Sequence, residues 1–318
     1  MMGGELLAAA TLDAVAGDPR WFPHPVRGMG IVINWCDNNI RKISRHPTTL
    51  RGAGVALALA LPLLMSVLSH EAIVMADRLT WWFGSLVTIG LAWTTLAARD
   101  LWNHVHAVSE QLDRGNLSEA RRAVGMIVGR DTEQLSQEEI ARATIETVAE
   151  STSDGIIAPL FYLALGGVPL ALAYKAVNTL DSMIGHKDER YIDFGWASAR
   201  LDDLANWIPA RLSAALIILT AAAVMREPIR ARTGWHVLWR DGNKHPSPNS
   251  GRPEAAMAGS LGIQLGGVNL YQGVPDDRPL LGQGGRHPDL RDIRAASRIM
   301  IGVGALGGTL AASLLCLV

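Results

Sequence analysis

The chain alternates between long apolar runs and polar loops. Three runs, at 79–98, 155–174 and 299–318, continue for twenty residues without a charged side chain. A helix needs about 20 apolar residues to cross the hydrocarbon core of a bilayer. The pattern therefore predicts an all-α protein, a polytopic integral membrane helical bundle with long polar loops. The predicted spans are 4–17, 52–70, 79–98, 155–174, 204–225 and 299–318.

Composition agrees with this fold class and excludes several others. Hydrophobic residues make up 49% of the chain, an ordinary value, but they are concentrated in blocks. The alternation of block and loop gives no boundary or repeat, so we expect one membrane domain over residues 1–318. Cys36 and Cys316 are too few for a disulfide framework or a cysteine metal cluster. A net charge of -1 gives no reason to expect nucleic acid as a partner.

The distribution of cations leaves two topologies open. Lys and Arg number five in 18–50, six in 98–155, four in 174–210 and ten in 226–297. If every run crosses the membrane, the loops with five, six and ten share one side, which fits the positive-inside rule. Alternatively, Gly166, Gly167 and Pro169 break the run at 155–174 into a re-entrant segment. The second topology places the polar residues on either side of that run in the same compartment.

Three carboxylates precede the run at 155–174. Glu146, Glu150 and Asp154 are spaced four residues apart, so they stack along one face of a helix. Like charges at this spacing repel one another and favour a compensating cation, and Mg²⁺ prefers such oxygen ligands. The same residues also fit a solvated helix face that pairs with Arg142.

A second polar cluster follows the same run. Lys175, Asn178 and Ser182 share a helical face, and Asp181 lies beside them in the sequence. Polar groups next to an apolar run usually face a partner or a water-filled cavity, and phosphate suits this set of donors. A snorkelling lysine at an ordinary helix end is the alternative. Asp202 and Asp203 repeat the acidic pattern before the next apolar run.

Two proline-rich loops and one turn supply further candidates. In the loop 245–254, Pro253 suits the first turn of a new helix, whose free amides could hold an anion beside Arg252. A structural turn is the alternative. His24 and Arg27, in the loop 17–27, offer donors to an acidic ligand, although a lone histidine is more often structural. Arg130, in the turn 129–132, is a candidate phosphate contact.

Taken together, these segments resemble the CobD/CbiB family of cobalamin biosynthesis proteins, the adenosylcobinamide-phosphate synthases of the bacterial membrane. Each motif is weak alone, but all occur in the family's order and cover most of the chain. The motifs are 12–13 with 17–19 and 24–26, 129–132, 146–155, 174–183, 202–206 and 245–254. The resemblance implies ligation of adenosylcobyric acid with (R)-1-amino-2-propanol O-2-phosphate, which uses ATP and Mg²⁺, at the bacterial inner membrane.

This reaction fits the candidate residues, and the following roles are a hypothesis from their chemistry. A metal site would use Glu146, Glu150 and Asp154. Residues for catalysis are Asp181, Asp202, Asp203 and Lys175. Residues for substrate and phosphate binding are Arg130, Asn178, Ser182, His245, Asn249, Arg252, His24 and Arg27. The implied partners are the corrinoid and amino-alcohol phosphate substrates, the lipid bilayer and other late corrinoid-pathway membrane enzymes. A transporter of a small anionic solute and a scaffold for corrinoid enzymes are the alternative functions.

Overall fold

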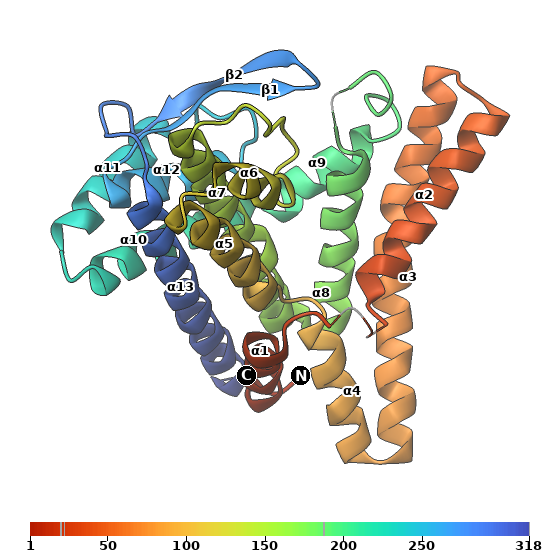
Figure 1. Ribbon diagram of the computed structural model, residues 1–318. Helices are drawn as coiled ribbons and strands as arrows, with labels where there is room; N and C mark the ends of the chain where they lie inside the picture. Colours follow the sequence, from red (N-terminus) through yellow and green to blue (C-terminus); the bar gives the residue numbers. More distant parts are fainter. Residues whose placement is uncertain (20, 22, 187, 318) are drawn as a thin grey trace. The chain divides into compact units, whose positions relative to one another are not determined.

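The computed structural model describes residues 1–19, 21, 23–186 and 188–317, and it is predominantly helical (Figure 1). Five helices are long and apolar enough to cross a membrane, which confirms the predicted polytopic helical fold. Val318, the last residue of the predicted span 299–318, lies outside the described residues. The chain forms two compact units, each built from separate segments. Because segments of both units carry spanning helices, the single membrane domain stays a prediction.

The first unit comprises residues 1–97, 158–206 and 308–318. Its elements are α1 (Gly3–Ala16), α2 (Pro25–Ile43), α3 (Pro47–Leu79), α4 (Trp81–Trp93), α8 (Ala158–Ile184), α9 (Trp196–Ala205) and the end of α13 (Leu290–Leu317). The helix α1 has 14 residues, or about 21 Å, which is short for the crossing predicted at 4–17.

The helices α3 and α4 form a tight antiparallel hairpin. Only Thr80 separates them, and a Cβ added at Gly84 would collide with the carboxylate of Asp77, so a side chain there would displace that carboxylate. Leu63 on α3 and Trp81 on α4 are 66% and 77% exposed. Large apolar side chains left open on two adjacent apolar helices are what a lipid-facing surface requires.

The apolar run at 155–174 folds back on itself. The dihedral angles of Gly166 (φ -146°, ψ 18°) and Gly167 (φ 66°, ψ -160°) interrupt α8, as the glycines and Pro169 led us to expect. The rings of Tyr162 and Tyr174 stack with centroids 4.8 Å apart. Twelve residues of straight helix would separate them by about 18 Å. The segment around these glycines is therefore a helical hairpin.

The second unit comprises residues 98–157 and 207–307. Its elements are α5 (Ala98–Asp113), α6 (Leu117–Gly125), α7 (Gln137–Thr152), the π-helix η1 (Ser153–Ile157), α10 (Trp207–Val224), α11 (Ile229–Asp241), α12 (Gly251–Leu261), the strands β1 (Leu265–Tyr271) and β2 (Val274–Leu281), and most of α13. Its core is α12, in which every residue except Arg252 is buried and which packs against α10 and α11. A Cβ at Gly259 would lie 2.7 Å from Cβ of Val237, so small residues permit this close approach.

The antiparallel strands β1 and β2 are an element that the apolar pattern did not predict. They pair Val268 with Asp277 and Tyr271 with Val274. A bulge interrupts the pairing between Leu265 and Gly267, where Gly266 and Gly267 have φ of 82° and 95°. These left-handed conformations need glycine, and they bring the strand's backbone groups to the residues described next.

Candidate active site

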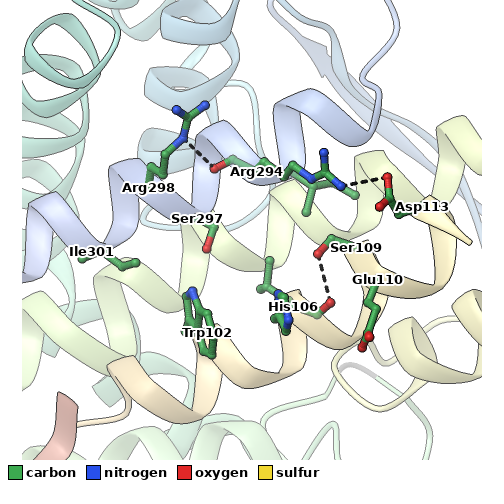
Figure 2. A pocket seen from close by; sticks show the side chains of 11 residues that line it. Trp102, His106, Ser109, Glu110, Asp113, Arg294, Ser297, Arg298 and Ile301 are labelled. Carbon is green, nitrogen blue, oxygen red and sulfur yellow. Dashed lines mark hydrogen bonds and ion pairs between the residues drawn. The ribbon is translucent and has the colours of Figure 1, made fainter. Parts of the chain in front are cut away.

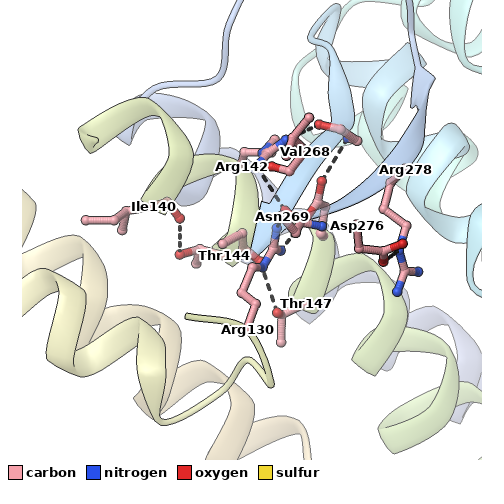
Figure 3. Close-up of polar contacts among 12 residues, drawn as sticks. Arg130, Ile140, Arg142, Thr144, Thr147, Val268, Asn269, Asp276 and Arg278 are labelled. Carbon is pink, nitrogen blue, oxygen red and sulfur yellow. Dashed lines mark hydrogen bonds and ion pairs between the residues drawn. The ribbon is translucent and has the colours of Figure 1, made fainter. Parts of the chain in front are cut away.

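In the second unit, the turn 129–132 and the helix α7 are joined to the β-hairpin by side chains (Figure 3). Arg130 donates hydrogen bonds to Oε2 of Glu146 and to Oδ1 of Asn269. Glu146 also accepts from the backbone amide of Gly266 at 2.8 Å. Both side chains of the Arg130–Glu146 pair are about nine-tenths buried, at 8% and 12% exposed. This pair anchors the sheet against α7, so both residues have a structural role.

The neighbouring Arg142 holds the same strand one turn earlier on α7. It donates to the carbonyl oxygens of Gly266 and Val268, the second at 2.9 Å, and to Oδ1 of Asn269 at 3.0 Å. Asn269 thus accepts from two guanidinium groups. The two terminal nitrogens of Arg142 thus bond to oxygens of β1, whereas its Nε is buried without a hydrogen-bond partner among the described residues.

The loop 245–254 reaches α7 through Glu150. Ser250 donates from Oγ to Oε1 of Glu150 at 2.8 Å, and the helix α12 begins at Gly251 with Pro253 in its first turn, as predicted. The ring of His245 accepts at Nδ1 from the amide of Ser247 at 3.0 Å. Burial, followed by the nearby Arg278 guanidinium, lowers the pKa of His245, so this ring is neutral at pH 7.

A third carboxylate joins Glu146 and Glu150. Glu254, in the first turn of α12, is 7% exposed. Burial, reinforced by the charges of Glu146 and Glu150, raises the pKa of Glu254 well above its ordinary value. The sequence analysis quoted Glu254 within a motif without giving it a role. Its position one helical turn after Ser250 is the signal that connects it with Glu150.

The donor atoms of this cluster suit a hard cation. Among the described residues, no group of three or more His, Cys, Asp or Glu side chains is arranged to hold a metal by itself. Mg²⁺ is commonly held by one or two carboxylates together with water and substrate phosphates, so Glu150 and Glu254 fit that mode of binding. Asp154 lies in η1, where the π-helical turn changes the four-residue spacing. The metal role of Glu146, Glu150 and Asp154 stays a prediction.

Two further predicted residues of this unit lie in the loop 245–254. Arg252 donates to Oδ1 of Asn243, and its Nε is buried without a hydrogen-bond partner in the described residues. Asn249 is 5% exposed. Their predicted role in binding phosphate or substrate stays a prediction.

In the first unit, α8 and α9 bring a second polar cluster together around Asp202. Asn206 is 1% exposed and donates from Nδ2 to both carboxylate oxygens of Asp202, each at 3.0 Å. Its Oδ1 accepts from the hydroxyl of Tyr174 at 3.0 Å. Tyr162 stacks on Tyr174 and donates to the carbonyl oxygen of Ala205 at 2.8 Å. The hairpin of α8 therefore fixes the position of Asp202 through Tyr174 and Asn206.

Two of the predicted catalytic carboxylates, Asp181 and Asp202, interact within this cluster. Burial, followed by the charge of Asp181, raises the pKa of Asp202 to about 7, against the hydrogen bonds from Asn206 and Asn178. The Asn178 amide lies 3.5 Å from Oδ1 of Asp202. A carboxyl group that titrates near neutral pH is suited to proton transfer. Asn206, four residues after Asp202, was not among the predicted site residues.

Other predicted residues of this unit have local partners. Ser182 donates to the carbonyl oxygen of Asn178 in its own helix, and Asp203 lies 3.7 Å from Arg200. His24 caps α2 by accepting from the amide of Val26 at 3.3 Å, and its Nε2 lies 3.5 Å from Asp18. Arg27 is exposed on α2, and Lys175 lies on α8 three residues before Asn178. Their predicted contacts with substrate stay predictions.

Comparison with known proteins agrees with this arrangement of motifs. The profile of the CobD/CbiB protein family matches residues 6–300. A cobalamin biosynthesis protein CobD of Geobacter metallireducens is 47% identical over 98% of this chain and 96% of its own length. A cobalamin biosynthesis protein CbiB of Salmonella typhimurium is 45% identical over 92% of this chain and 91% of its own length. No solved structure matches the chain. The chain therefore belongs to the CobD/CbiB family.

Proposed function

We propose that the protein acts in cobalamin biosynthesis as an amide ligase of the bacterial inner membrane. It joins adenosylcobyric acid to (R)-1-amino-2-propanol O-2-phosphate, or a close amino-alcohol phosphate, with ATP and Mg²⁺. The family membership supports the pathway. The observation that supports this reaction is the polar cluster of the second unit, where Glu150 and Glu254 lie near the charges of Arg130 and Arg278. Carboxylates beside guanidinium groups suit the gathering of several phosphates.

The reaction needs an activated acid and a neutral amine. A carboxylate does not react with an amine, so the corrinoid carboxylate attacks the γ-phosphorus of ATP and gives an acyl phosphate and ADP. The ammonium group of the second substrate loses one proton and its nitrogen attacks the acyl carbon. Inorganic phosphate leaves and the nitrogen releases a second proton. Asp202 accepts the first proton, because its pKa of about 7 leaves a basic carboxylate available at neutral pH.

The remaining residues bind charge. Glu150 and Glu254 would hold Mg²⁺ together with water, and the bound ion would neutralise phosphate charge. Arg252, whose Nε is buried without a hydrogen-bond partner in the described residues, binds phosphate oxygens. Asn178 and Asn249 position the substrates.

Both polar clusters must face the same compartment for this mechanism. The hairpin of α8 supports that topology, since its apolar arms, 155–165 and 168–174, span about 16 Å and 10 Å as helices. Neither arm crosses a hydrocarbon core of about 30 Å. We therefore treat 155–174 as a re-entrant segment, the second of the two topologies that the sequence left open.

Contacts within the second unit restrict the next helix as well. Because Ser250 bonds to Glu150 and the amide of Gly266 bonds to Glu146, we assign these residues to the same side of the membrane. Since residues 150 and 250 then lie on one side, the chain between them must cross the membrane an even number of times. If 155–174 is re-entrant, α10 does not cross either, although its 18 residues are long and apolar enough. Instead, α10 packs on α12 within the second unit.

In this topology, the two sides of the membrane differ strongly in the number of Lys and Arg residues. The polar stretches 18–50, 98–155, 174–210 and 226–297 all share one side, with their five, six, four and ten cations. The connection between α3 and α4 lies on the other side, beside Arg78. The positive-inside rule then makes the loop side cytoplasmic, where ATP is available.

Mass spectrometry of products tests the reaction directly. Purified protein is incubated with ATP, Mg²⁺, adenosylcobyric acid and the amino-alcohol phosphate, and each component is omitted in turn. We expect adenosylcobinamide phosphate and stoichiometric ADP only in the complete mixture. Failure of well-folded protein to form product under any of these conditions contradicts the proposal.

A broken apolar helix also occurs in transporters, so the same protein should be tested for flux. Proteoliposomes loaded with the amino-alcohol phosphate or the corrinoid are followed without ATP. Release no faster than from empty liposomes supports ligation. Rapid ATP-independent release, without product in the ligation assay, favours the transporter. Product formed by the purified protein alone excludes a scaffold as its sole role.

A further inference from the structure

A groove of about 540 Å³ lies between α5 and α13 in the second unit, apart from the residues of the proposed reaction (Figure 2). The two helices run antiparallel along it, so that Arg294 meets Asp113 at one end and Ile301 lies toward Trp102 at the other. The first end is polar, with Arg294 and Asp113 2.8 Å apart. The second end is aromatic and apolar. The groove thus changes from polar to apolar along its length.

The apolar end of the groove lies where one apolar run of the sequence ends and another begins. The run 79–98 ends directly before Arg99, and the run 299–318 begins directly after Arg298. Trp102 stacks on His106 with ring centroids 4.9 Å apart, and Cζ of Arg99 lies 4.8 Å from the Trp102 ring. Tryptophan next to arginine at the end of a span is typical of the headgroup region of a bilayer. This end of the groove therefore lies at the depth of the lipid phosphates.

Two cations at this depth have no carboxylate partner in the described part of the chain. Arg298 donates from Nε to the carbonyl oxygen of Arg294 at 3.3 Å, and Arg99 contacts the Trp102 ring. The carboxylates of the groove are engaged elsewhere, because Asp113 pairs with Arg294 and Glu110 pairs with Arg114 at 2.6 Å. Uncompensated charge near the hydrocarbon favours a counter-anion at the same depth.

We infer that this groove binds an anionic phospholipid of the surrounding membrane. The phosphodiester contacts Arg298, the polar headgroup extends toward Ser297 and Arg294, and an acyl chain follows Ile301 and Trp102. Basic pockets between membrane helices bind anionic headgroups in this way. Ile301 is 51% exposed, which leaves apolar surface for the chain. The inference is independent of the ligation reaction.

Native mass spectrometry of detergent-purified protein tests the inference with phosphatidylglycerol and phosphatidylcholine as probes. Arg298→Gln removes the phosphate contact, and Ser297→Trp fills the groove while it keeps the charge. Arg122→Gln is the matched control, because Arg122 is 81% exposed on α6 and pairs only weakly with Glu119 at 3.9 Å. Thermal unfolding without added lipid identifies any variant that fails to fold.

We expect the wild type to retain phosphatidylglycerol in preference to phosphatidylcholine. Loss of one cation near the bilayer surface should weaken phosphatidylglycerol binding about five-fold in Arg298→Gln. Ser297→Trp should also lose the lipid, and Arg122→Gln should not. Unchanged binding in both groove variants would overturn the inference. So would full displacement of the lipid by millimolar inorganic phosphate, since the groove would then be a site for soluble phosphate.

Discussion

The most informative perturbation concerns Asn206, which holds the proposed proton acceptor. Asn206→Ala removes two N–H···O hydrogen bonds, each 3.0 Å long, that stabilise the charged form of Asp202. Hydrogen bonds to charged groups contribute about 1.5–3 kcal/mol each, and about 1.4 kcal/mol corresponds to one pKa unit. Because water replaces part of this loss, we expect the pKa of Asp202 to rise by about one unit, from about 7 to about 8.

The direction of the change in rate depends on the role of Asp202 as proton acceptor. Asp202 works only when deprotonated, so kcat falls about ten-fold per pH unit below its pKa. A rise of about one unit lowers the rate about five-fold at pH 7 and leaves it nearly unchanged above pH 9. Thr179→Val is the matched control, because the Thr179 hydroxyl donates to Lys175 in its own helix and does not touch Asp202.

The assay is kcat for product formation between pH 5.5 and 9.5, measured by mass spectrometry. The Asp202→Asn variant should lose most activity, and its plot of kcat against pH should show no acidic limb with a pKa near 7. An acidic limb in Asn206→Ala that coincides with that of the wild type would refute the reasoning. Equal loss of rate at every pH would also refute it, since damage to the fold has no reason to depend on Asp202 protonation.

Three further predictions follow from the second unit and the hairpin. Glu150→Gln should abolish ligation and weaken binding of Mn²⁺, a spectroscopic probe for Mg²⁺, while membrane insertion is kept; retained turnover would remove Glu150 from the metal site. The Glu254→Gln variant should have a melting temperature within a few degrees of that of the wild type, since the raised pKa of Glu254 already favours a neutral side chain. The same variant should bind Mn²⁺ more weakly; unaltered Mn²⁺ affinity would exclude Glu254 from the metal site. Gly167→Ala should destabilise the protein by about 1–3 kcal/mol in denaturant titrations, because φ is 66° and ψ is -160° there, a conformation essentially restricted to glycine; no change would mean that the break tolerates a side chain.

The sequence predicted the helical membrane fold well because uninterrupted apolar runs have few physical alternatives. It also located the break at Gly166 and Gly167, since glycine and proline disturb a helix by local chemistry. The β-hairpin was missed because Gly266, Gly267 and the prolines and aspartates of β2 weaken the alternation typical of strands.

For the candidate site, the sequence indicated only associations between residues that are close along the chain. Spacing correctly associated Asn178 with Asp181 on one helix, and these residues meet Asp202 in the structure. Spacing cannot reveal partners that are distant in sequence. Glu146 was read as one of three equivalent carboxylates, but Arg130 and the amide of Gly266 engage both of its oxygens. Asn206 bonds to Asp202 four residues before it, but its contact with Tyr174 and the proximity of Glu254 to Glu150 depend on tertiary structure.

The account depends most on one compartment containing both polar clusters, and cysteine labelling measures this directly. In a Cys36→Ser, Cys316→Ser background, single cysteines replace exposed Ser182 on α8, exposed Val274 on the β-hairpin or Thr80 between α3 and α4. A membrane-impermeant thiol reagent is applied to inside-out vesicles and to spheroplasts. We predict labelling of positions 182 and 274 only in inside-out vesicles, and of position 80 only in spheroplasts. Labelling of positions 182 and 274 from opposite sides would contradict the account.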